Sequence, residues 1–229
     1  PTPAPAVKFA DLLGDGPLPS GVNAVVRKWK THHEKTLFDA IKTGKQTVLV
    51  AAMNEVIRYV LVRLGDKDSD AIKTADILAL HVADRRDILL RARRRTYSDP
   101  VVVLNWTCRP PLMRDGGCGR ETTSRMNLDK LPTVKAAMPQ PIKLSDGRTL
   151  QYAPPTGAVE EYVARLGKGV DELKLHELMS ARGCRIDGQP ITEEVAIDLD
   201  AEDGERVLSA LNDVGGTDTL LLSRCFGCG

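Results

Sequence analysis

The sequence has few aromatic residues and no long apolar run. Aromatic side chains make up 4% of its 229 residues, and its longest apolar stretches, such as Thr47–Met53, are short. A bilayer span needs about 18–20 consecutive apolar residues. The opening segment, Pro1–Pro5, also lacks the basic and apolar regions of a secretory signal. We therefore expect an intracellular protein without membrane association, whose initiator methionine has been removed.

Neither sign of charge dominates the chain. It has 32 Lys and Arg residues against 31 Asp and Glu residues, a formal net charge of +1. Binding to nucleic acid or to an anionic membrane gains from an excess of basic charge, so any such function must depend on a local patch. Five cysteines are an odd number for a disulfide framework, and a chain of this length can bury a core without staples. Both observations argue against a disulfide-rich secreted scaffold.

The pattern of apolar residues predicts an α+β fold. We expect an N-terminal helical unit, a central small β-hairpin or zinc-ribbon-like region, and an α-rich C-terminal region with a final strand. The boundaries are an extended arm over 1–21, a helical domain over 22–98, a β-rich cysteine-bearing region over 99–156, and a mainly helical region over 157–229 that returns to the cysteine site. Because the arm is rich in proline and glycine, we expect it to add little to the core and to become ordered only against neighbouring subunits.

Local periodicity predicts the individual elements. Apolar residues at helical spacing run from Thr31 to Leu64, with Gly44 separating two helices, and a third helix is expected over Thr74–Arg95. The later part of the chain predicts a strand at Val101–Trp106, a hairpin over Ile142–Tyr152, helices at Ala158–Leu166, Asp171–Arg182, Glu193–Leu199 and Gly204–Val214, and a last strand at Thr219–Ser223.

One arginine of the third predicted helix falls on its apolar face. Arg85 shares that face with Leu89, so we expect its side chain to point inward. A buried guanidinium needs a hydrogen-bonding partner, because an unpaired buried charge is costly. The nearest candidates in sequence are Asp84, Glu55 and the Tyr97–Asp99 turn.

Four cysteines suggest a metal site. Cys108 and Cys118 follow one predicted strand, and Cys225 and Cys228 form a C-x-x-C after another. Four thiolates from two loops are a common way to close a tetrahedral structural Zn²⁺ site, which would leave no open position for catalysis. Four reduced thiols, or a pair of disulfides, are the alternatives. The fifth cysteine, Cys184, has no partner motif, and we expect it to be a buried, inert thiol.

Enzymatic motifs fail their spacing tests. The segment His176–Ser180 begins like the H-E-x-x-H helix of metalloproteases but has serine at the second ligand position. Gly44–Thr47 lacks the residues of a phosphate-binding loop, and the chain contains no G-x-S-x-G. We therefore predict no catalytic residues and a protein that is not an enzyme.

The order of several short motifs is more informative than any one of them. These are Asn54-Glu55-Val56-Ile57, the charged segment Leu80–Arg91, Tyr97-Ser98-Asp99, Leu144–Arg148, Pro155-Thr156-Gly157 with Glu160-Glu161, and the terminal Cys225-x-x-Cys228-Gly229. This order resembles that of the baseplate hub proteins of T-even-type contractile-tailed bacteriophages, over residues 15–229.

The resemblance implies a non-catalytic virion structural protein. It would lie in the tail baseplate after assembly in the host cytoplasm, in multiple copies within a symmetric structure. The partners that the resemblance implies are other baseplate hub and wedge proteins and the tape measure protein.

A rival hypothesis is a zinc-ribbon nucleic-acid-binding or regulatory module. Its phosphate-contacting surface would be Arg85–Arg95 together with Lys28–Lys30. The same arginines also suit the negative end of a helix dipole and ordinary salt bridges. Since no aromatic residues are interleaved with them, we expect nucleic acid not to be a partner.

Overall fold

The computed structural model describes residues 7–8, 15–107, 121–134, 139–167, 174–212 and 216–217, and its fold is α+β, as predicted. The helices are α1 (Thr31–Lys42), α2 (Gln46–Val60), α3 (Thr74–Ala79), α4 (Val82–Thr96), the 3₁₀ turn η2 (Leu128–Lys130), α5 (Gly157–Arg165), α6 (Leu175–Ala181), α7 (Glu193–Ile197) and α8 (Ala201–Asn212).

The strands are short and pair in four small antiparallel sheets. The first sheet has the order β2 (Gly16–Pro17), β3 (Asn23–Val26), β4 (Leu61–Leu64), β5 (Lys67–Asp68), and the second has the order β12 (Gln189–Pro190), β11 (Arg185–Ile186), β10 (Thr149–Gln151), β9 (Ile142–Lys143). The other two are the pair β6 (Val101–Thr107) with β7 (Glu121–Asn127), and the sheet β1 (Val7–Lys8), β8 (Pro132–Val134), β13 (Gly216–Thr217).

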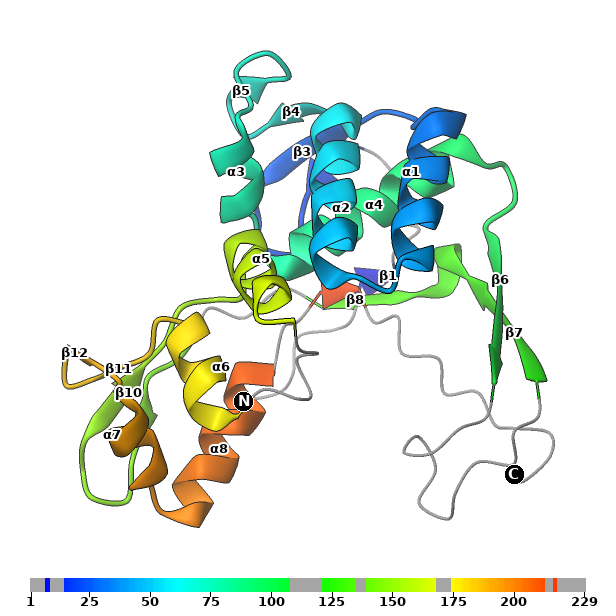
Figure 1. Cartoon of the computed structure of the whole chain (residues 1–229). Helices are drawn as coiled ribbons and strands as arrows, with labels where there is room; N and C mark the ends of the chain where they lie inside the picture. The colour runs from blue at the N-terminus through cyan, green and yellow to red at the C-terminus, as the bar shows by residue number, and fades with distance from the viewer. Residues whose placement is uncertain are drawn as a thin grey trace.

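These elements form two bodies (Figure 1). The larger contains α1–α4 and the β2–β5 sheet, and the smaller contains the β9–β12 sheet with α6, α7 and α8. Helix α5 lies between them and contacts α2, α3 and α4 on one side and α6 on the other. The β6–β7 ribbon projects away from the larger body, apart from the smaller one.

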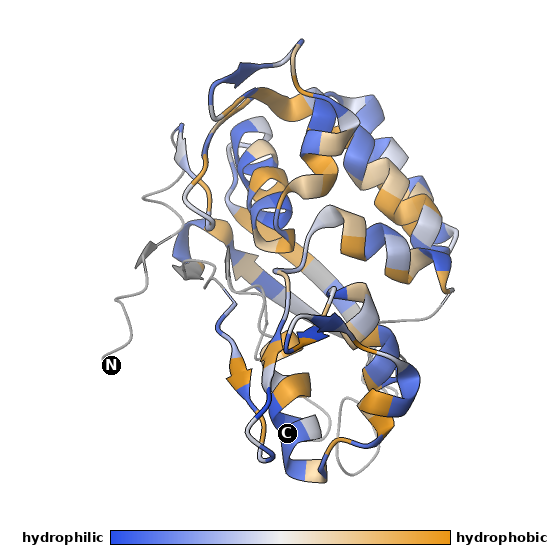
Figure 2. Ribbon diagram, turned by 90° about the vertical axis from the view of Figure 1, so that its left-hand side faces the viewer, coloured by the Kyte–Doolittle hydropathy of each residue, from blue (hydrophilic) through white to orange (hydrophobic). Residues whose placement is uncertain are grey.

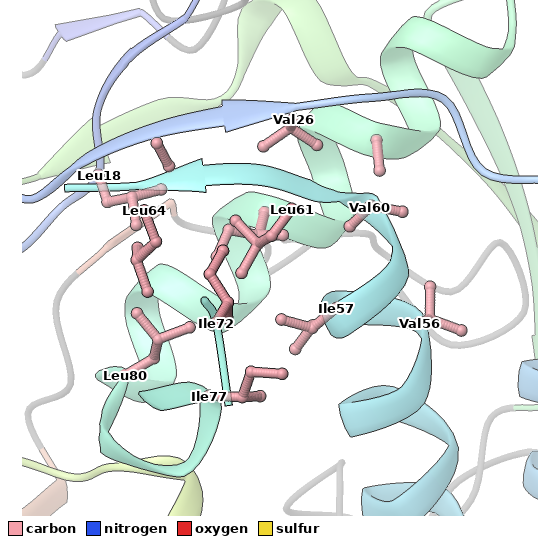
Figure 3. Packing of buried hydrophobic residues seen from close by; sticks show 13 residues of the cluster. Leu18, Val26, Val56, Ile57, Val60, Leu61, Leu64, Ile72, Ile77 and Leu80 are labelled. Carbon is pink, nitrogen blue, oxygen red and sulfur yellow. The ribbon is translucent and has the colours of Figure 1, made fainter. Parts of the chain in front are cut away.

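The larger body has an apolar core where the β3–β4 pair packs on α2 and α4. Val56, Ile57 and Val60 of α2 are fully buried there, as their helical spacing predicted, and Leu61 and Leu64 of β4 join them (Figure 3). Helices and strands carry apolar residues interspersed with polar ones, the pattern of elements with one buried face (Figure 2).

The second predicted helix ends earlier than expected. Residues 61–64 form β4. The spacing of Leu61 and Leu64 fits a buried stripe on a helix as well as an irregular strand, and pairing with Ala24–Val26 of β3 favours the strand. The register shifts between Val25 and Val26, which brings both leucines of β4 into the core.

The structure also corrects the prediction of an extended arm over residues 1–21. Leu18 is 3% exposed and belongs to the main core, and Gly16–Pro17 forms β2. Val7–Lys8 pairs with β8 of the same chain. The expectation that residues 1–21 add little to the core and are ordered only against neighbouring subunits is therefore wrong at these positions.

The smaller body has a second apolar core. The predicted hairpin over Ile142–Tyr152 forms as β9 and β10, and it pairs with β11. Leu150, Met179, Val207 and Leu211 bring the sheet, α6 and α8 together. The structure thus groups β9 and β10 with α6–α8 and attaches α5 to the larger body, across the boundary drawn at residue 156. The last predicted strand, at Thr219–Ser223, lies outside the described residues.

Within the described part of the chain, every helix is too short or too polar to cross a bilayer.

Candidate functional site: a buried arginine junction

Helix α4 buries an unusual amount of charge. Asp84, Arg85, Asp87 and Arg91 are each no more than 1% exposed. Acidic residues in the first turns and arginines in the last ones suit the helix dipole. Dipole compensation alone does not require burial, however, so the partners of these side chains reveal what the helix holds together.

Arg85 makes three polar contacts with three different elements. Its Nε donates to Glu160 Oε2 of α5 at 2.7 Å, and its Nη2 donates to Asn54 Oδ1 of α2 at 2.7 Å. Its Nη1 donates to the carbonyl of Ile77 in α3 at 3.2 Å. One planar guanidinium therefore ties α2, α3 and α5 to α4, which is the geometry that a fixed fork of donors provides.

The start of α5 lies directly against this guanidinium. A Cβ built on Gly157 would be 2.6 Å from Arg85 Nη1 and 2.9 Å from its Cζ. Only a glycine allows the helix backbone to approach so closely, and the φ angle of Gly157 is an ordinary one. The glycine is thus required here by space.

Backbone pairing explains why the predicted third helix divides at residues 80 and 81. The Val82 amide donates to the Pro155 carbonyl at 2.8 Å, and the Gly157 amide donates to the Leu80 carbonyl at 3.0 Å. His81 forms a bridge with Thr156 between them. These hydrogen bonds involve backbone groups of the corner between α3 and α4. They join the segment 155–157 to the start of α4, beside Arg85.

The opposite flank of α4 holds the N-terminal segment. Asp84 Oδ1 accepts from the Ser20 amide at 2.9 Å, and Arg91 donates to the carbonyls of Gly16 at 3.2 Å and Pro17 at 2.7 Å. Arg91 Nε lies 2.8 Å from Asp87 Oδ2 one turn earlier in the helix. The two buried acidic residues and Arg91 therefore fix residues 16–20 against the core.

Two of the four remaining arginines of α4 pair with carboxylates as well. Arg94 forms a two-pronged ion pair with Asp129, at 2.7 and 3.1 Å, which raises the pKa of its guanidinium through hydrogen bonding to that carboxylate. Arg95 pairs with Asp15 at 2.8 Å and also donates to the Val26 carbonyl. Arg86 is exposed.

The sequence therefore predicted the burial of Arg85 correctly and its partners wrongly. Asp84 serves Ser20, and neither Glu55 nor the Tyr97–Asp99 turn is among the hydrogen-bond partners of Arg85. Two of its three partners, Asn54 and Glu160, lie in motifs that carried the family resemblance, and the Ile77 carbonyl lies outside them. Nothing in the sequence indicated that these residues converge on one arginine.

The proposed zinc ligands Cys108, Cys118, Cys225 and Cys228 all lie outside the described residues, so the site stays a prediction. In the ranges that the structure does describe, no group of three or more His, Cys, Asp or Glu side chains could hold a metal ion. Cys184 is 3% exposed, and burial raises the pKa of its thiol to about 12. A thiol with such a pKa stays protonated, as expected of an inert cysteine.

The chemistry of the junction suits a structural role, in which one side chain connects several helices. An arginine stays protonated throughout the physiological range, so it neither donates nor accepts a proton in a reaction. Two grooves of the described surface lie away from the junction: one of about 500 Å³ beside Asn23 and Arg63 of the β3–β4 pair, and one of about 350 Å³ between α6 and α7. No family model, curated protein or solved structure matches this chain.

Proposed function

We propose that this chain is a non-enzymatic structural protein of a contractile phage tail, built into the baseplate hub and its assembly near the tape measure. The observation that carries the proposal is the convergence of the resemblance motifs. Asn54, Arg85, Gly157 and Glu160 come from three separate motifs, and they meet at one buried junction. Motifs that determine a shared architecture would be expected to meet in this way.

The use of charge supports an architectural role. The buried ionisable side chains of α4 fix segments that are distant in sequence, and Arg182 holds backbone carbonyls of the smaller body. A subunit of a large assembly needs such a fixed shape, because its loops must be presented to neighbours in a set geometry. Partners of this role would be other hub and wedge proteins and the tape measure protein, with the product located in the virion.

The rival nucleic-acid module is disfavoured by the same contacts. Arg85 and Arg91 are buried, and Arg94 and Arg95 are engaged with carboxylates. Few guanidinium groups of the proposed phosphate-contacting surface remain for phosphates. A steep fall in DNA affinity with rising salt would be the signature of that rival.

The test is genetic. An amber codon should be placed in this gene, in the phage genome that encodes it, and particles from suppressing and non-suppressing hosts compared by electron microscopy and by mass spectrometry of purified tails. We expect peptides of this chain in tails from the suppressing host and no complete baseplates from the other. Intact contractile tails formed without the protein would overturn the proposal.

A further inference from the structure

Two exposed surfaces of opposite charge lie far apart on the molecule. Residues 27–48, which include α1 and the turn into α2, carry six basic residues against two acidic ones. Residues 193–206, which include α7 and the start of α8, carry seven acidic residues against one basic one, and six of the seven are exposed, Asp203 being buried. Figure 1 places α1 at one end of the molecule and α7 and α8 at the other. One chain therefore cannot bring its own two surfaces together in this conformation.

The basic surface has an apolar ridge. Phe38 and Ile41 of α1 are 55% and 61% exposed, and they lie three residues apart on one helix face. The Lys42 ammonium is 4.3 Å from the centroid of the Phe38 ring, and Lys45 follows three residues later. Both acidic residues of this surface already have partners: Asp39 pairs with Lys35, and Glu34 accepts a hydrogen bond from the Tyr97 hydroxyl. The ridge thus presents two apolar side chains and the Lys42 ammonium, with Lys45 following at the start of α2.

The acidic surface has an apolar groove. The cavity of about 350 Å³ between α6 and α7 is lined by Lys174, Leu175, His176, Glu193, Ala196 and Ile197. Ile197 is 71% exposed, the most exposed of the large apolar side chains described. Glu193 and Glu194 lie on α7 three to four residues before it, and Asp198 follows it directly. Lys174 and His176 also line the groove, and His176 Nε2 lies 3.7 Å from Glu193 Oε1. The exposed carboxylates of Glu194 and Asp198, on either side of Ile197 in sequence, are therefore the groups that would face lysines of a partner.

We infer that these two surfaces bind each other between copies of this chain, head to tail. Phe38 and Ile41 of one copy would contact Ile197 and the α6–α7 groove of the next, and Lys42 and Lys45 would face the α7 carboxylates. Apolar contact at the centre with charges at the rim is the usual anatomy of a protein interface. Opposite charges also favour this pairing over like surfaces meeting. The inference does not depend on the phage assignment.

The pairing uses different surfaces on the two copies, so the interface is heterologous. A dimer formed in this way leaves one ridge and one groove free, and association therefore continues into a ring or an open filament. Two variants that each lose one surface should then complement each other. A symmetric interface, in which the same patch meets itself, would not behave in this way.

The experiment is sedimentation velocity on the full chain under reducing conditions, from micromolar to millimolar protein. We expect the sedimentation coefficient of the wild type to rise with concentration, and to rise much less at about 0.5 M salt, where charges more than a few ångströms apart are screened. Phe38→Asp and Ile197→Lys should each weaken association by about tenfold or more. Val103→Asp, at an equally exposed apolar position on β6, is the matched control and should associate as the wild type does.

Mixing decides the geometry. An equimolar mixture of Phe38→Asp and Ile197→Lys contains one intact groove and one intact ridge, so it should form a 1:1 dimer and nothing larger. Unchanged thermal unfolding curves would show that both variants are folded. A wild type that stays monomeric, a mixture that fails to dimerise, or association that either single variant leaves intact would overturn the inference. None of these results would bear on virion incorporation, which the amber-codon test reads separately.

Discussion

The two bodies of this molecule are held together differently. In the smaller body, a core centred on Leu150, Met179 and Val207 joins elements that all fall between residues 142 and 212, and its buried Arg182 and Asp203 bond to groups within the same range. In the larger body, buried charges bridge segments that are far apart in sequence: Arg85 and Glu160 are 75 residues apart, as are Arg91 and Gly16. Apolar packing is nondirectional, whereas a guanidinium selects the position and direction of each acceptor. The difference suggests that the larger body relies on charge to specify how distant segments meet.

Removing the junction should have the largest effect. Arg85→Ala leaves Glu160 and Asn54 without their donor and opens a cavity at a fully buried position. We expect a loss of about 3 kcal/mol, or a fall in melting temperature of about 6–12 °C. Thermal unfolding followed by circular dichroism measures it. The exposed neighbour, Arg86→Ala, should change stability by less than about 0.5 kcal/mol, and equal effects of the two substitutions would refute the role of Arg85.

A smaller change tests the closeness of α5 to the arginine. Gly157→Ala should destabilise the protein by about 1–2 kcal/mol, because the added Cβ meets a guanidinium that three hydrogen bonds hold in place. Gly204→Ala in α8 is the matched control. Its Cβ would lie 3.6 Å from Leu175 Cδ2, an ordinary contact, so the higher helix propensity of alanine should stabilise by about 0.5–1 kcal/mol. Denaturant unfolding of both variants should therefore give shifts of opposite sign.

The smaller body contains a buried carboxylate, Asp203, whose hydrogen bonds depend on pH. Asp203 is buried and accepts from the Ser145 amide at 2.8 Å and from its hydroxyl at 2.7 Å, and these hydrogen bonds lower the pKa of the Asp203 carboxyl. A lowered pKa means that the unfolded chain binds the proton more readily, so stability is lost as pH falls below about 4. Between about pH 5 and 2, the range in which carboxylates titrate, the free energy of unfolding of Asp203→Asn should fall less with decreasing pH than that of the wild type. An unchanged acid dependence would contradict this account.

The smallest effect is expected at the start of α1. His33 is 3% exposed and its Nδ1 accepts from the Lys30 amide at 3.2 Å. Burial, followed by the neighbouring His32, lowers the pKa of His33, although Glu55 opposes the shift. The unfolded chain therefore binds a proton first, and stability should decline as pH falls below about 6.5. Stability measured in that range should decline less in His33→Asn; a decline of the same size in the variant would assign it to other groups.

The contrast between the bodies also explains what the sequence could predict. The hairpin over Ile142–Tyr152 was found because its alternation and its Asp146-Gly147 turn are local features. Leu61–Leu64 was wrongly predicted as helix, because its strand partner, Asn23–Val26, lies almost forty residues earlier. Local patterns report which face of an element is buried, but they carry no information on what covers it.

The arginine junction follows the same rule. The position of Arg85 on an apolar stripe correctly predicted its burial, but the predicted partners, such as Asp84 and Glu55, were residues near in sequence or on a neighbouring helix. Glu160 lies 75 residues away in the chain, and the need for Gly157 depends on a backbone approach that only the tertiary fold creates. The zinc hypothesis depends on Cys108, Cys118, Cys225 and Cys228, and metal analysis of the purified protein remains its test.

A double-mutant cycle between α4 and α5 tests the central claim most directly. Arg85→Met, Glu160→Gln and the double variant should be compared with the wild type by denaturant unfolding. If the pair fastens α5 to the larger body, the free energies of unfolding will be non-additive, with a coupling of about 1–3 kcal/mol. Additivity to within about 0.3 kcal/mol would contradict the claim, because it would mean that Arg85 and Glu160 contribute to stability independently of each other.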